Sequence, residues 1–453
     1  MNVKNKRILI IGMARSGEAV AKVLNKLGAY IIMNDLKNAE ELGDLVEKVK
    51  PYINELVLGS HIENFNNIDL VVLSPGVPLY IEPVKKAISN NIEVIGELEL
   101  AYRLIEGTFI AITGTNGKTT TTALTGLIFK NAKLHSHIVG NIGLPVISKV
   151  FDSKKNTFLI TEVSSFQLET IYEFKPNISA ILNITPDHLN RHKTLEEYIR
   201  VKKKVFMNQN ENDYLILNYD NEITNKIGIE LNNKNIIYFS LKKIIENGVY
   251  IYNNQIIVND NGKEIKICSV DDIKILGNHN LENIMAATAI AYYSKIDKDI
   301  IEKSLKEFNG VEHRIEFVRE LNNVKYYNDS KGTNPDATIK AIEAMNEKII
   351  LIAGGMDKGS NFTEMVKSFK GNVKELVLFG ETKELIKEEA EKYSDCRITI
   401  VDNLSDAVKL SFEFAFSGEV VLLSPACASW DMYESFEHRG KEFKKLVNNL
   451  QID

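Results

Sequence analysis

The sequence has few cysteines, no excess of positive charge and no long apolar run. Its three cysteines, Cys268, Cys396 and Cys427, are odd in number and far apart in 453 residues, which argues against a disulfide framework. The net charge of −6 argues against a general nucleic-acid binder, because such proteins normally present a basic face. No apolar stretch approaches the ~20 residues that a helix needs to cross a bilayer, so we expect no membrane insertion.

The first residues, Met-Asn-Val-Lys-Asn-Lys-Arg, lead directly into a predicted strand and lack the pattern of a signal peptide. We therefore expect a cytoplasmic protein. The length predicts roughly two to four domains, each large enough to bury its own core. The hydrophobic content of 44% and the charged content of 26% are ordinary for a globular chain.

A glycine-containing loop near the end of the first quarter of the chain predicts a nucleotide site. The apolar run Phe109–Ile112 predicts a buried strand, and Thr120–Phe129 has the spacing of a helix. The loop between them consists of Gly114, Thr115, Asn116, Gly117, Lys118 and Thr119. Its backbone N–H groups and the helix start favour phosphate, the lysine can reach the outer phosphates, and the last hydroxyl can bind Mg²⁺. A generic P-loop would have glycine at the position of Ile112, so the match is partial.

The first predicted strand, Arg7–Ile11, leads into a turn that resembles the dinucleotide-binding fingerprint. Asp35 follows at the end of a second strand, where the fingerprint places an acid that binds a ribose hydroxyl. Ala14 replaces the second glycine of the pattern and would crowd a pyrophosphate. A tight strand-to-helix turn is therefore a simpler interpretation of this segment than an NAD site.

Polar and small residues follow other predicted strands as well. The strand Leu70–Leu73 ends in a loop that contains Gly76, and ligands of open α/β sheets bind beyond the carboxyl ends of the strands. We expect this loop and the two preceding turns to share one anionic ligand. Farther along, Glu162 ends one strand, and His188 follows a strand predicted at Ala180–Ile184. Either residue alone could face solvent, but together behind strands that flank a phosphate loop they fit Mg²⁺ chemistry beside a triphosphate.

Two polar segments of the middle of the chain have more than one interpretation. Lys202, Lys203 and Lys204 lie in a helix predicted over Leu195–Met207, and most of this run is expected to be a solvated face. Asn280 lies near the start of a later helix, where helix capping and contact with a purine are both open.

The alternation of strands and helices predicts an α/β chain of three domains, with boundaries at 1–96, 97–309 and 310–453. The first and third are expected to be Rossmann-like. The central one is expected to be P-loop ATPase-like, with a mostly parallel sheet and β-hairpins added over residues 249–275. The strand ends of the third domain carry polar loops, at residues 329–334, 354–358 and 424–429.

The motifs taken together resemble those of the Mur ligases, the ATP-dependent amide-forming enzymes of peptidoglycan synthesis. They span the whole chain and comprise Thr113–Thr119, Glu162 with Ser164–Gln167, Asn183–His188, His279–Asn283 and His313–Arg314. The loop without glycine at position 112 is the form that this family shows. Asn328–Asn334 and Ser424–Ser429, followed by Phe436–Gly440, resemble the branch that adds D-glutamate to UDP-N-acetylmuramoyl-L-alanine.

The resemblance implies the reaction and its participants. ATP would activate the free carboxylate of UDP-N-acetylmuramoyl-L-alanine as an acyl phosphate, which the amine of D-glutamate would attack through a tetrahedral intermediate. The expected partners are these small molecules, with two Mg²⁺ ions as cofactors, no nucleic acid, and a monomeric cytoplasmic enzyme. An alternative is another Mur-type or folylpolyglutamate-type ligase with a different amino-acid substrate.

The resemblance also implies roles for individual residues. Lys118, His188 and Lys202 would be catalytic. The implied metal ligands are Thr119, Glu162, His188 and Lys202, the last as a carbamylated lysine. The implied ATP contacts are Gly114, Thr115, Asn116, Gly117, Lys118, Thr119, Thr120, Asn280, Arg314 and Asp329. The UDP-substrate contacts are Ser16, Asp35, Gly76 and Asn141, and the D-glutamate contacts are Lys331, Thr333, Lys358, Ser429 and Phe436.

Two interpretations of other kinds compete with a ligase. A nicotinamide-dependent oxidoreductase is suggested by the first turn, but it has no use for the sequence Gly117-Lys118-Thr119. A non-catalytic nucleotide-gated protein would bind ATP without substrate-dependent phosphate release. Ligands contributed by three domains imply closure of the third domain over the second, with a hinge expected near 309–312.

Overall fold

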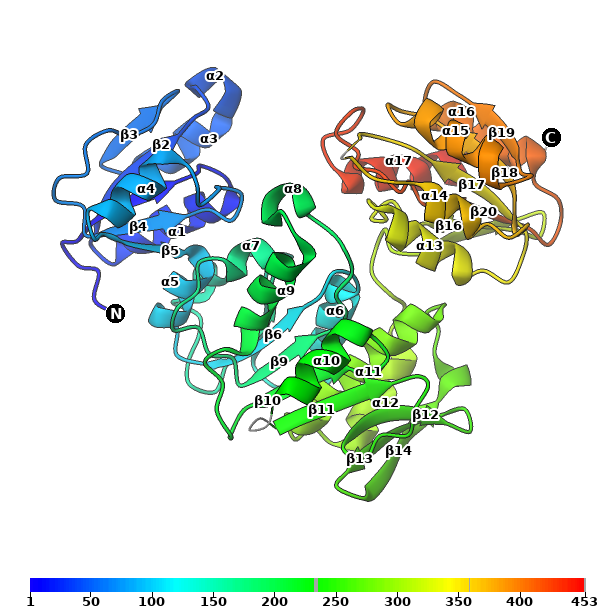
Figure 1. Ribbon diagram of the computed structural model, residues 1–453, viewed down its shortest axis with the longest axis horizontal. Helices are drawn as coiled ribbons and strands as arrows, with labels where there is room; N and C mark the ends of the chain where they lie inside the picture. Colours follow the sequence, from blue (N-terminus) through cyan, green and yellow to red (C-terminus); the bar gives the residue numbers. More distant parts are fainter. Residues whose placement is uncertain (232–234, 358, 452–453) are drawn as a thin grey trace. The chain divides into compact units, whose positions relative to one another are not determined.

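The computed structural model describes residues 1–231, 235–357 and 359–451. It contains three β-sheets with helices packed against them (Figure 1). The chain divides into two compact units, Met1–Asp272 with Glu282–Lys306 and Ile273–Leu281 with Glu307–Asp453. The first unit holds two of the sheets and the second unit holds the third.

The first sheet is wholly parallel, with strand order β3-β2-β1-β4-β5. Its strands are β1 (Arg7–Ile11), β2 (Tyr30–Asp35), β3 (Glu55–Leu58), β4 (Leu70–Leu73) and β5 (Glu93–Gly96). Its helices are α1 (Arg15–Lys26), α2 (Ala39–Leu42), α3 (Asp44–Val49), the 3₁₀ turn η1 (Lys50–Tyr52) and α4 (Glu82–Ser89). All four residues of β4 are buried, as expected of an apolar strand inside a parallel sheet. The carboxyl ends of β1, β2 and β4 lie side by side, so the turns that follow them meet at one edge.

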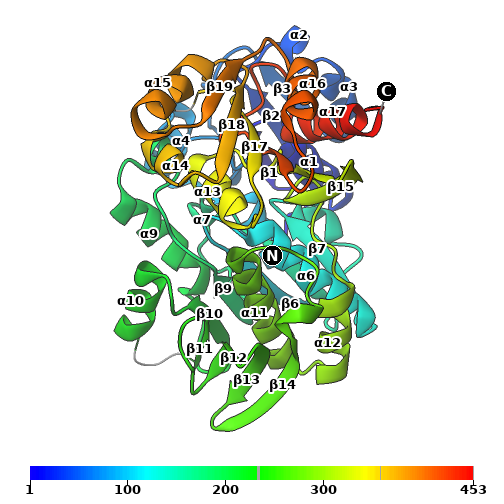
Figure 2. The same ribbon diagram turned by 90° about the vertical axis from the view of Figure 1, so that its right-hand side faces the viewer.

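The central sheet has nine strands in the order β14-β13-β12-β11-β10-β9-β6-β8-β7. They are β6 (Thr108–Thr113), β7 (Ser136–Gly140), β8 (Phe158–Glu162), β9 (Ile178–Ile181), β10 (Tyr214–Asn218), β11 (Asn235–Ser240), β12 (Gly248–Tyr252), β13 (Gln255–Asp260) and β14 (Lys263–Ser269). The pairs from β7 through to β12 are parallel, and β12, β13 and β14 pair antiparallel with one another as the predicted hairpins at one end (Figure 2). The phosphate-loop strand β6 lies between β9 and β8.

The helices of the central region are α5 (Glu97–Leu104), α6 (Lys118–Asn131), α7 (Ser165–Leu168), α8 (Leu189–His192), α9 (Leu195–Lys203), α10 (Glu222–Glu230), α11 (Asn278–Tyr293) and α12 (Lys298–Glu307). Three short 3₁₀ turns accompany them, η2 (Val146–Lys149), η3 (Lys204–Phe206) and η4 (Val270–Asp272).

Two element boundaries predicted from the sequence are wrong. The strand predicted at Ala180–Ile184 is β9, which ends at Ile181. The apolar residues that follow are buried in a loop that braces the phosphate loop, so their hydrophobicity does not indicate a strand. The helix predicted over Leu195–Met207 ends at Lys203 and continues as the 3₁₀ turn η3.

The first two sheets share an apolar core. A single cluster of buried side chains includes Ile8 and Ile10 of β1, Leu98 of α5, and Phe109 and Ala111 of β6. The opposite face of the first sheet has a smaller core of its own. Helix α5 follows β5 directly. Its buried apolar side chains contact both sheets and so connect them.

The third sheet has six strands in the order β15-β16-β20-β17-β18-β19, and β15 alone is antiparallel to its neighbour. Its strands are β15 (Glu316–Leu321), β16 (Val324–Asn328), β17 (Ile349–Ala353), β18 (Val373–Leu378), β19 (Arg397–Ile400) and β20 (Val420–Leu423). Its helices are α13 (Pro335–Glu343), α14 (Thr363–Lys367), α15 (Lys383–Tyr393), α16 (Leu404–Phe414) and α17 (Phe436–Asn448). Separate apolar clusters cover its two faces. Over the described ranges, no helix is long and apolar enough to span a bilayer.

Candidate active site

The phosphate loop is held in shape by glycines and by the segment after β9. Gly117 has φ +86°, and a Cβ there would lie 2.2 Å from Asn283 Oδ1, so this position requires glycine. The Asn116 N–H donates to Asn183 Oδ1 at 2.8 Å, and Asn183 Nδ2 donates to the Asn116 carbonyl at 3.1 Å. The Thr115 hydroxyl donates to the Thr185 carbonyl at 3.1 Å. The chain therefore fixes a loop that is open to an anion at the start of α6, whose first turn carries Thr119 and Thr120.

Two lysines converge on the carbonyl of Gly114. Lys118 Nζ donates to it at 2.8 Å and Lys202 Nζ at 2.9 Å. Lys202 also donates to Thr113 Oγ1 at 3.3 Å and is 1% exposed. Burial lowers the pKa of Lys202 well below its ordinary value, and the nearby Lys118 lowers it further, against a smaller opposing effect of Asp187. Burial therefore shifts the Lys202 amine toward its neutral form.

Tyr198 is part of this site and was missed by the sequence analysis. It lies one helical turn before Lys202 on α9, and Lys202 Nζ sits 4.8 Å from the centre of its ring. A hydrogen bond of 3.3 Å joins its hydroxyl to Thr115 Oγ1, and burial raises its pKa. The spacing of four residues on a helix was the signal that could have identified it.

Glu162 places a buried carboxylate at the end of β8. Its Oε1 accepts a hydrogen bond of 2.7 Å from Asn141 Nδ2, and the Asn141 N–H donates to the Glu162 carbonyl at 2.9 Å. Its Oε2 is buried and accepts no hydrogen bond from the described residues. A buried carboxylate oxygen without a donor suits a cation, so Glu162 fits the predicted role of a metal ligand. The predicted substrate contact Asn141 orients it.

His188 lies on the loop after β9, in a left-handed conformation with φ +53°. Its ring is exposed, with Nε2 3.7 Å from Asp187 Oδ2 and its centroid 4.9 Å from that of Phe166. The neighbouring His192 is different, because it is buried and its Nε2 forms a hydrogen bond of 2.9 Å with Ser165 Oγ. Burial lowers the pKa of His192. Of the two histidines, His188 is exposed and His192 is buried.

The predicted UDP contacts meet at the edge of the first sheet. Asp35 accepts the N–H of Met13 at 2.7 Å and that of Lys37 at 2.9 Å, so its carboxylate joins the turns after β1 and β2. Ser74 Oγ donates to the Gly12 carbonyl at 2.8 Å and joins the turn after β4 to them. The structure thus brings together Ser16, which is half-buried, and the exposed Gly76. Arg15 donates to the carbonyl of Gly143, two residues after Asn141.

In the second unit, Asp329 is completely buried at the end of β16. Its Oδ2 accepts from Ser424 Oγ at 2.7 Å, its Oδ1 accepts from the Ile315 N–H at 3.2 Å, and Arg314 Nη1 lies 3.8 Å away. Burial raises the pKa of Asp329 to about 6, although Arg314 acts in the opposite direction. Asn280 is buried in the first turn of α11, and its Nδ2 donates to the Leu276 carbonyl at 2.7 Å.

A buried arginine that the sequence analysis missed, Arg439, contacts the two loops that carry the predicted D-glutamate residues Lys331 and Ser429. Arg439 donates to the carbonyls of Ser330 and Cys427, each at 3.0 Å, and thereby fixes the loops after β16 and β20. Around these loops, Lys331 Nζ lies 5.0 Å from the ring centre of Phe436, Thr333 is half-buried and Ser429 is 2% exposed. Lys358 lies outside the described residues.

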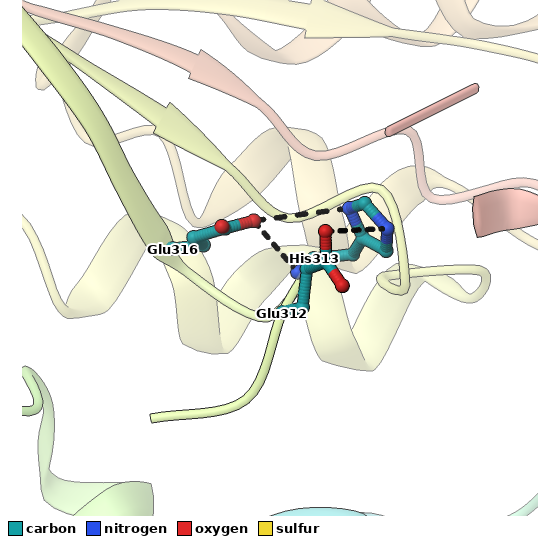
Figure 3. Close-up of side chains that lie close together, drawn as sticks. All are labelled: Glu312, His313 and Glu316. Atoms are coloured by element: carbon teal, nitrogen blue, oxygen red, sulfur yellow. Dashed lines mark hydrogen bonds and ion pairs between the residues drawn. The ribbon is translucent and has the colours of Figure 1, made fainter. Parts of the chain in front are cut away.

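One acidic group near this region has the composition of a metal site. Glu312, His313 and Glu316 offer ligand atoms within 4.8 Å of one another (Figure 3). Lys444 Nζ, however, donates to Glu312 at 2.8 Å and to Glu316 at 2.7 Å. His313 Nδ1 forms a hydrogen bond of 2.9 Å with Asn328 Nδ2. A lysine thus already bridges the two carboxylates, and we assign no metal here.

Three α/β domains with a glycine-lysine phosphate loop and a buried carboxylate beside it define a class of multidomain nucleotide-dependent enzymes. Solved structures with the same fold include UDP-N-acetylmuramate-alanine ligase MurC from Thermotoga maritima, with 20% identity, a TM-score of 0.60 and coverage of 98% of this chain and 99% of that one. Another is MurF ligase from Thermotoga maritima in complex with ADP, with 16% identity, a TM-score of 0.60 and coverage of 93% and 96%.

Comparison of the sequence identifies the family. Residues 6–96 match the Mur ligase MurD-like N-terminal domain, 112–291 the Mur ligase middle domain, and 313–427 the Mur ligase glutamate ligase domain. A protein named UDP-N-acetylmuramoylalanine--D-glutamate ligase from Clostridioides difficile (strain 630) is 53% identical over 100% of both chains. A protein of the same name from Alkaliphilus oremlandii (strain OhILAs) is 49% identical over 100% of both. The chain belongs to the Mur ligase family.

Proposed function

We propose that the protein is an ATP-dependent ligase that adds D-glutamate to UDP-N-acetylmuramoyl-L-alanine in peptidoglycan precursor synthesis. The observation that carries the proposal is the similarity over the full chain, at 53% and 49% identity, to relatives named for this reaction. The lysines and buried carboxylate at the phosphate loop support it, because phosphoryl transfer depends on positioning and charge neutralisation. We place the reaction in the cytoplasm, where ATP and nucleotide sugars are made, and propose a monomer with domains 1–96, 97–309 and 310–453.

In the proposed reaction, the substrate carboxylate attacks the γ-phosphorus of ATP, and the bond to the bridging oxygen of ADP breaks. The amine of D-glutamate then adds to the carbonyl carbon of the acyl phosphate. The tetrahedral intermediate expels phosphate, and the nitrogen loses a proton, which leaves the amide. Lys118, at the start of α6 where the helix dipole also favours anions, is proposed to neutralise the transferring phosphoryl group.

The metal ligands are proposed to be Thr119, Glu162, His188 and Lys202, with two Mg²⁺ ions. When bound, Mg²⁺ would neutralise charge on the phosphates and the acyl phosphate. The buried oxygen of Glu162 that accepts no hydrogen bond supports its part in this set. Lys202 is proposed to act as a carbamate, since a buried neutral amine can attack CO₂ and lose a proton, which converts a cation into an anionic oxygen ligand.

The substrate contacts remain as proposed from the sequence. ATP would contact residues 114–120, Asn280, Arg314 and Asp329; the UDP substrate would contact Ser16, Asp35, Gly76 and Asn141; and D-glutamate would contact Lys331, Thr333, Lys358, Ser429 and Phe436. Support for the UDP set is the hydrogen bonding that joins the turns after β1, β2 and β4. Support for the D-glutamate set is its cations and hydroxyls, which suit a dicarboxylate.

An assay of phosphate release tests the proposal. UDP-N-acetylmuramoyl-L-alanine, ATP and Mg²⁺ are combined with D-glutamate, L-glutamate, L-lysine or diaminopimelate, and release above background is expected with D-glutamate. Release with L-lysine or diaminopimelate instead would reassign the amino-acid substrate. ATP binding without phosphate release for any amino acid would support the nucleotide-gated alternative and refute the ligase.

A further inference from the structure

Arg191 is a half-buried arginine of the central domain whose guanidinium is held by a carboxylate. It belongs to the single turn of α8, which begins directly after His188, and its side chain is 13% exposed. Its Nε donates to Glu169 Oε1 at 3.2 Å, and its Nη2 donates to Glu169 Oε2 at 2.5 Å. A guanidinium that bonds both oxygens of a carboxylate is fixed in direction as well as in position. Glu169 therefore orients Arg191.

The same guanidinium reaches the loop that follows β4 in the first sheet. Arg191 Nη2 donates to the Val77 carbonyl at 2.9 Å, across 114 residues of sequence. The Val77 N–H donates to the Ser74 carbonyl at 2.9 Å, so residues 74–77 form a turn. Within the described ranges, the bond from Arg191 is the one hydrogen bond between this turn and the central domain. Arg191 therefore supplies the polar contact that holds the loop against the central domain.

Phe166 of α7 brings His188, a proposed metal ligand, into the same set of contacts. The guanidinium carbon of Arg191 lies 5.3 Å from the centre of the Phe166 ring, which is within the range of a cation–π contact. The same ring meets the His188 ring edge-on, with the centres 4.9 Å apart and the planes at 60°. One aromatic side chain thus contacts both the arginine that holds the loop and the histidine of the proposed site.

His192, the next residue after Arg191, holds α8 on the same segment of the chain. Its Nε2 forms a hydrogen bond of 2.9 Å with Ser165 Oγ, and its Nδ1 lies 3.6 Å from Glu169 Oε1. A helix of one turn is not stable by itself, so these side-chain contacts set the orientation of α8. They thereby also determine where His188, directly before α8, is placed.

The proposed substrate has to span the contact between this loop and the central domain. Gly76 in the loop is a proposed contact of its UDP end, whereas its carboxylate has to reach the phosphate loop of the central domain. The substrate makes both contacts together only if the distance between them matches its own length. A loop that is held at the right distance before binding costs less ordering when the substrate binds.

We propose that Arg191 is a positioning residue for the nucleotide-sugar substrate, because it holds the loop of residues 74–77 at a fixed distance from the segment that carries His188. The inference rests on the proposed function for the identity of the substrate and on the contacts of Arg191 for the position of the loop. A salt bridge that served stability alone would change the fraction of folded enzyme, and with it the apparent kcat, without changing KM.

Steady-state kinetics test the positioning role. For Arg191→Ala we expect KM for UDP-N-acetylmuramoyl-L-alanine to rise about tenfold, with KM for ATP within about twofold of wild type, because only the loop loses its polar contact. Arg191→Lys keeps the charge but cannot bond Val77 and both oxygens of Glu169 at once, so its KM should rise only about threefold. An unchanged KM for the UDP substrate in Arg191→Ala would overturn the proposal.

Arg200→Ala is the matched control for loss of a paired arginine. Arg200 on α9 also bonds both oxygens of a carboxylate, that of Glu197, but its side chain is 65% exposed. We expect wild-type KM values for both substrates in this variant. A rise in KM for the UDP substrate as large as that of Arg191→Ala would attribute the effect to charge and refute positioning.

Hydrogen–deuterium exchange measured by mass spectrometry tests the same contact without any substrate. In Arg191→Ala, we expect exchange in peptides that contain Val77 to become roughly threefold faster or more, because the turn is no longer held, while Arg200→Ala exchanges there as wild type does. Equal exchange around Val77 in Arg191→Ala and wild type would refute the positioning role even if the ligase assay succeeded. A failed ligase assay would leave this measurement valid, and if Arg191→Ala does not fold, the same comparison with Arg191→Lys decides.

Discussion

At the phosphate loop, the fold places two lysine side chains close together, and a bound anion would reduce the repulsion between their charges. Lys118 and Lys202 donate to the same carbonyl, that of Gly114, and only Lys202 is fully buried. Burial and the charge of Lys118 lower the pKa of Lys202, and the opposing effect of Asp187 is smaller. With an anion bound at the loop, we expect Lys118 to contact the anion, while Lys202 serves as the proposed metal ligand.

Replacement of Lys118 by alanine should abolish most of the activity while the fold persists. We expect kcat for phosphate release to fall roughly 10²–10³-fold or more, because one preorganised electrostatic donor is lost. Lys130→Ala, an exposed lysine near the end of the same helix, is the matched control and should keep wild-type kcat. A near-wild-type rate for Lys118→Ala would remove this residue from the mechanism.

Replacement of Lys202 by alanine tests the proposed carbamate. The variant should lose activity, and a small added carboxylate such as acetate should restore part of it by occupying the space of the carbamate beside Thr113. Lys203→Ala, the next residue along α9 and partly exposed, should retain activity and show no response to acetate. Unaffected activity in Lys202→Ala, measured as phosphate release, would disprove the carbamate.

At the scale of elements, the site depends on hydrogen bonds between the segment after β9 and the phosphate loop. Asn183, just beyond β9, uses both ends of its side-chain amide to hold the backbone of Asn116. This pairing explains why the chain leaves the sheet after Ile181 although the following residues are apolar. The loop is preorganised by a neighbouring segment and not by its own sequence alone.

Loss of this brace should weaken nucleotide binding without removing any phosphate ligand. For Asn183→Ala we expect the Kd of ATP, measured by calorimetry, to rise roughly tenfold, because two hydrogen bonds that order the loop are lost. Asn212→Ala, an exposed asparagine before β10, is the control and should bind ATP as wild type does. An unchanged Kd for Asn183→Ala would mean that the loop orders itself.

The elements that could be predicted from the sequence are those with continuous apolar runs. The strands β1 and β4 have the predicted bounds, because each is buried on both faces of a parallel sheet. Strand β15 was missed because it is an edge strand, and only Leu321 of its six residues is buried.

The sequence predicts those site residues that motifs place at strand ends. It does not predict the residues that contact the site from distant parts of the chain. Arg439 carries no local signal of its role, since its partners are the carbonyls of Ser330 and Cys427. For Tyr198 the local signal was its spacing of four residues from Lys202 on α9. The turn after β1 suggested a nicotinamide enzyme, but it lies in the region matched by the MurD-like N-terminal domain, and the family assignment removes that alternative.

For the whole molecule, the distribution of cores predicts how it unfolds. The first and central sheets share one apolar cluster through α5, whereas the third sheet has clusters of its own on both faces. Three sheets should therefore unfold as two cooperative units, Met1–Asp272 with Glu282–Lys306 and Ile273–Leu281 with Glu307–Asp453. Differential scanning calorimetry should resolve two transitions and not three.

Two core substitutions assign these transitions. Leu98→Ala in the shared cluster and Leu422→Ala in β20 each remove a buried side chain from a core. Each should lower the free energy of unfolding by about 2–5 kcal/mol. Leu98→Ala should lower one Tm by roughly 5–10 °C and Leu422→Ala the other by a similar amount. If Leu98→Ala instead split its transition in two, the first and central sheets would be separate folding units. The shared cluster would then be an interface between two domains that unfold separately.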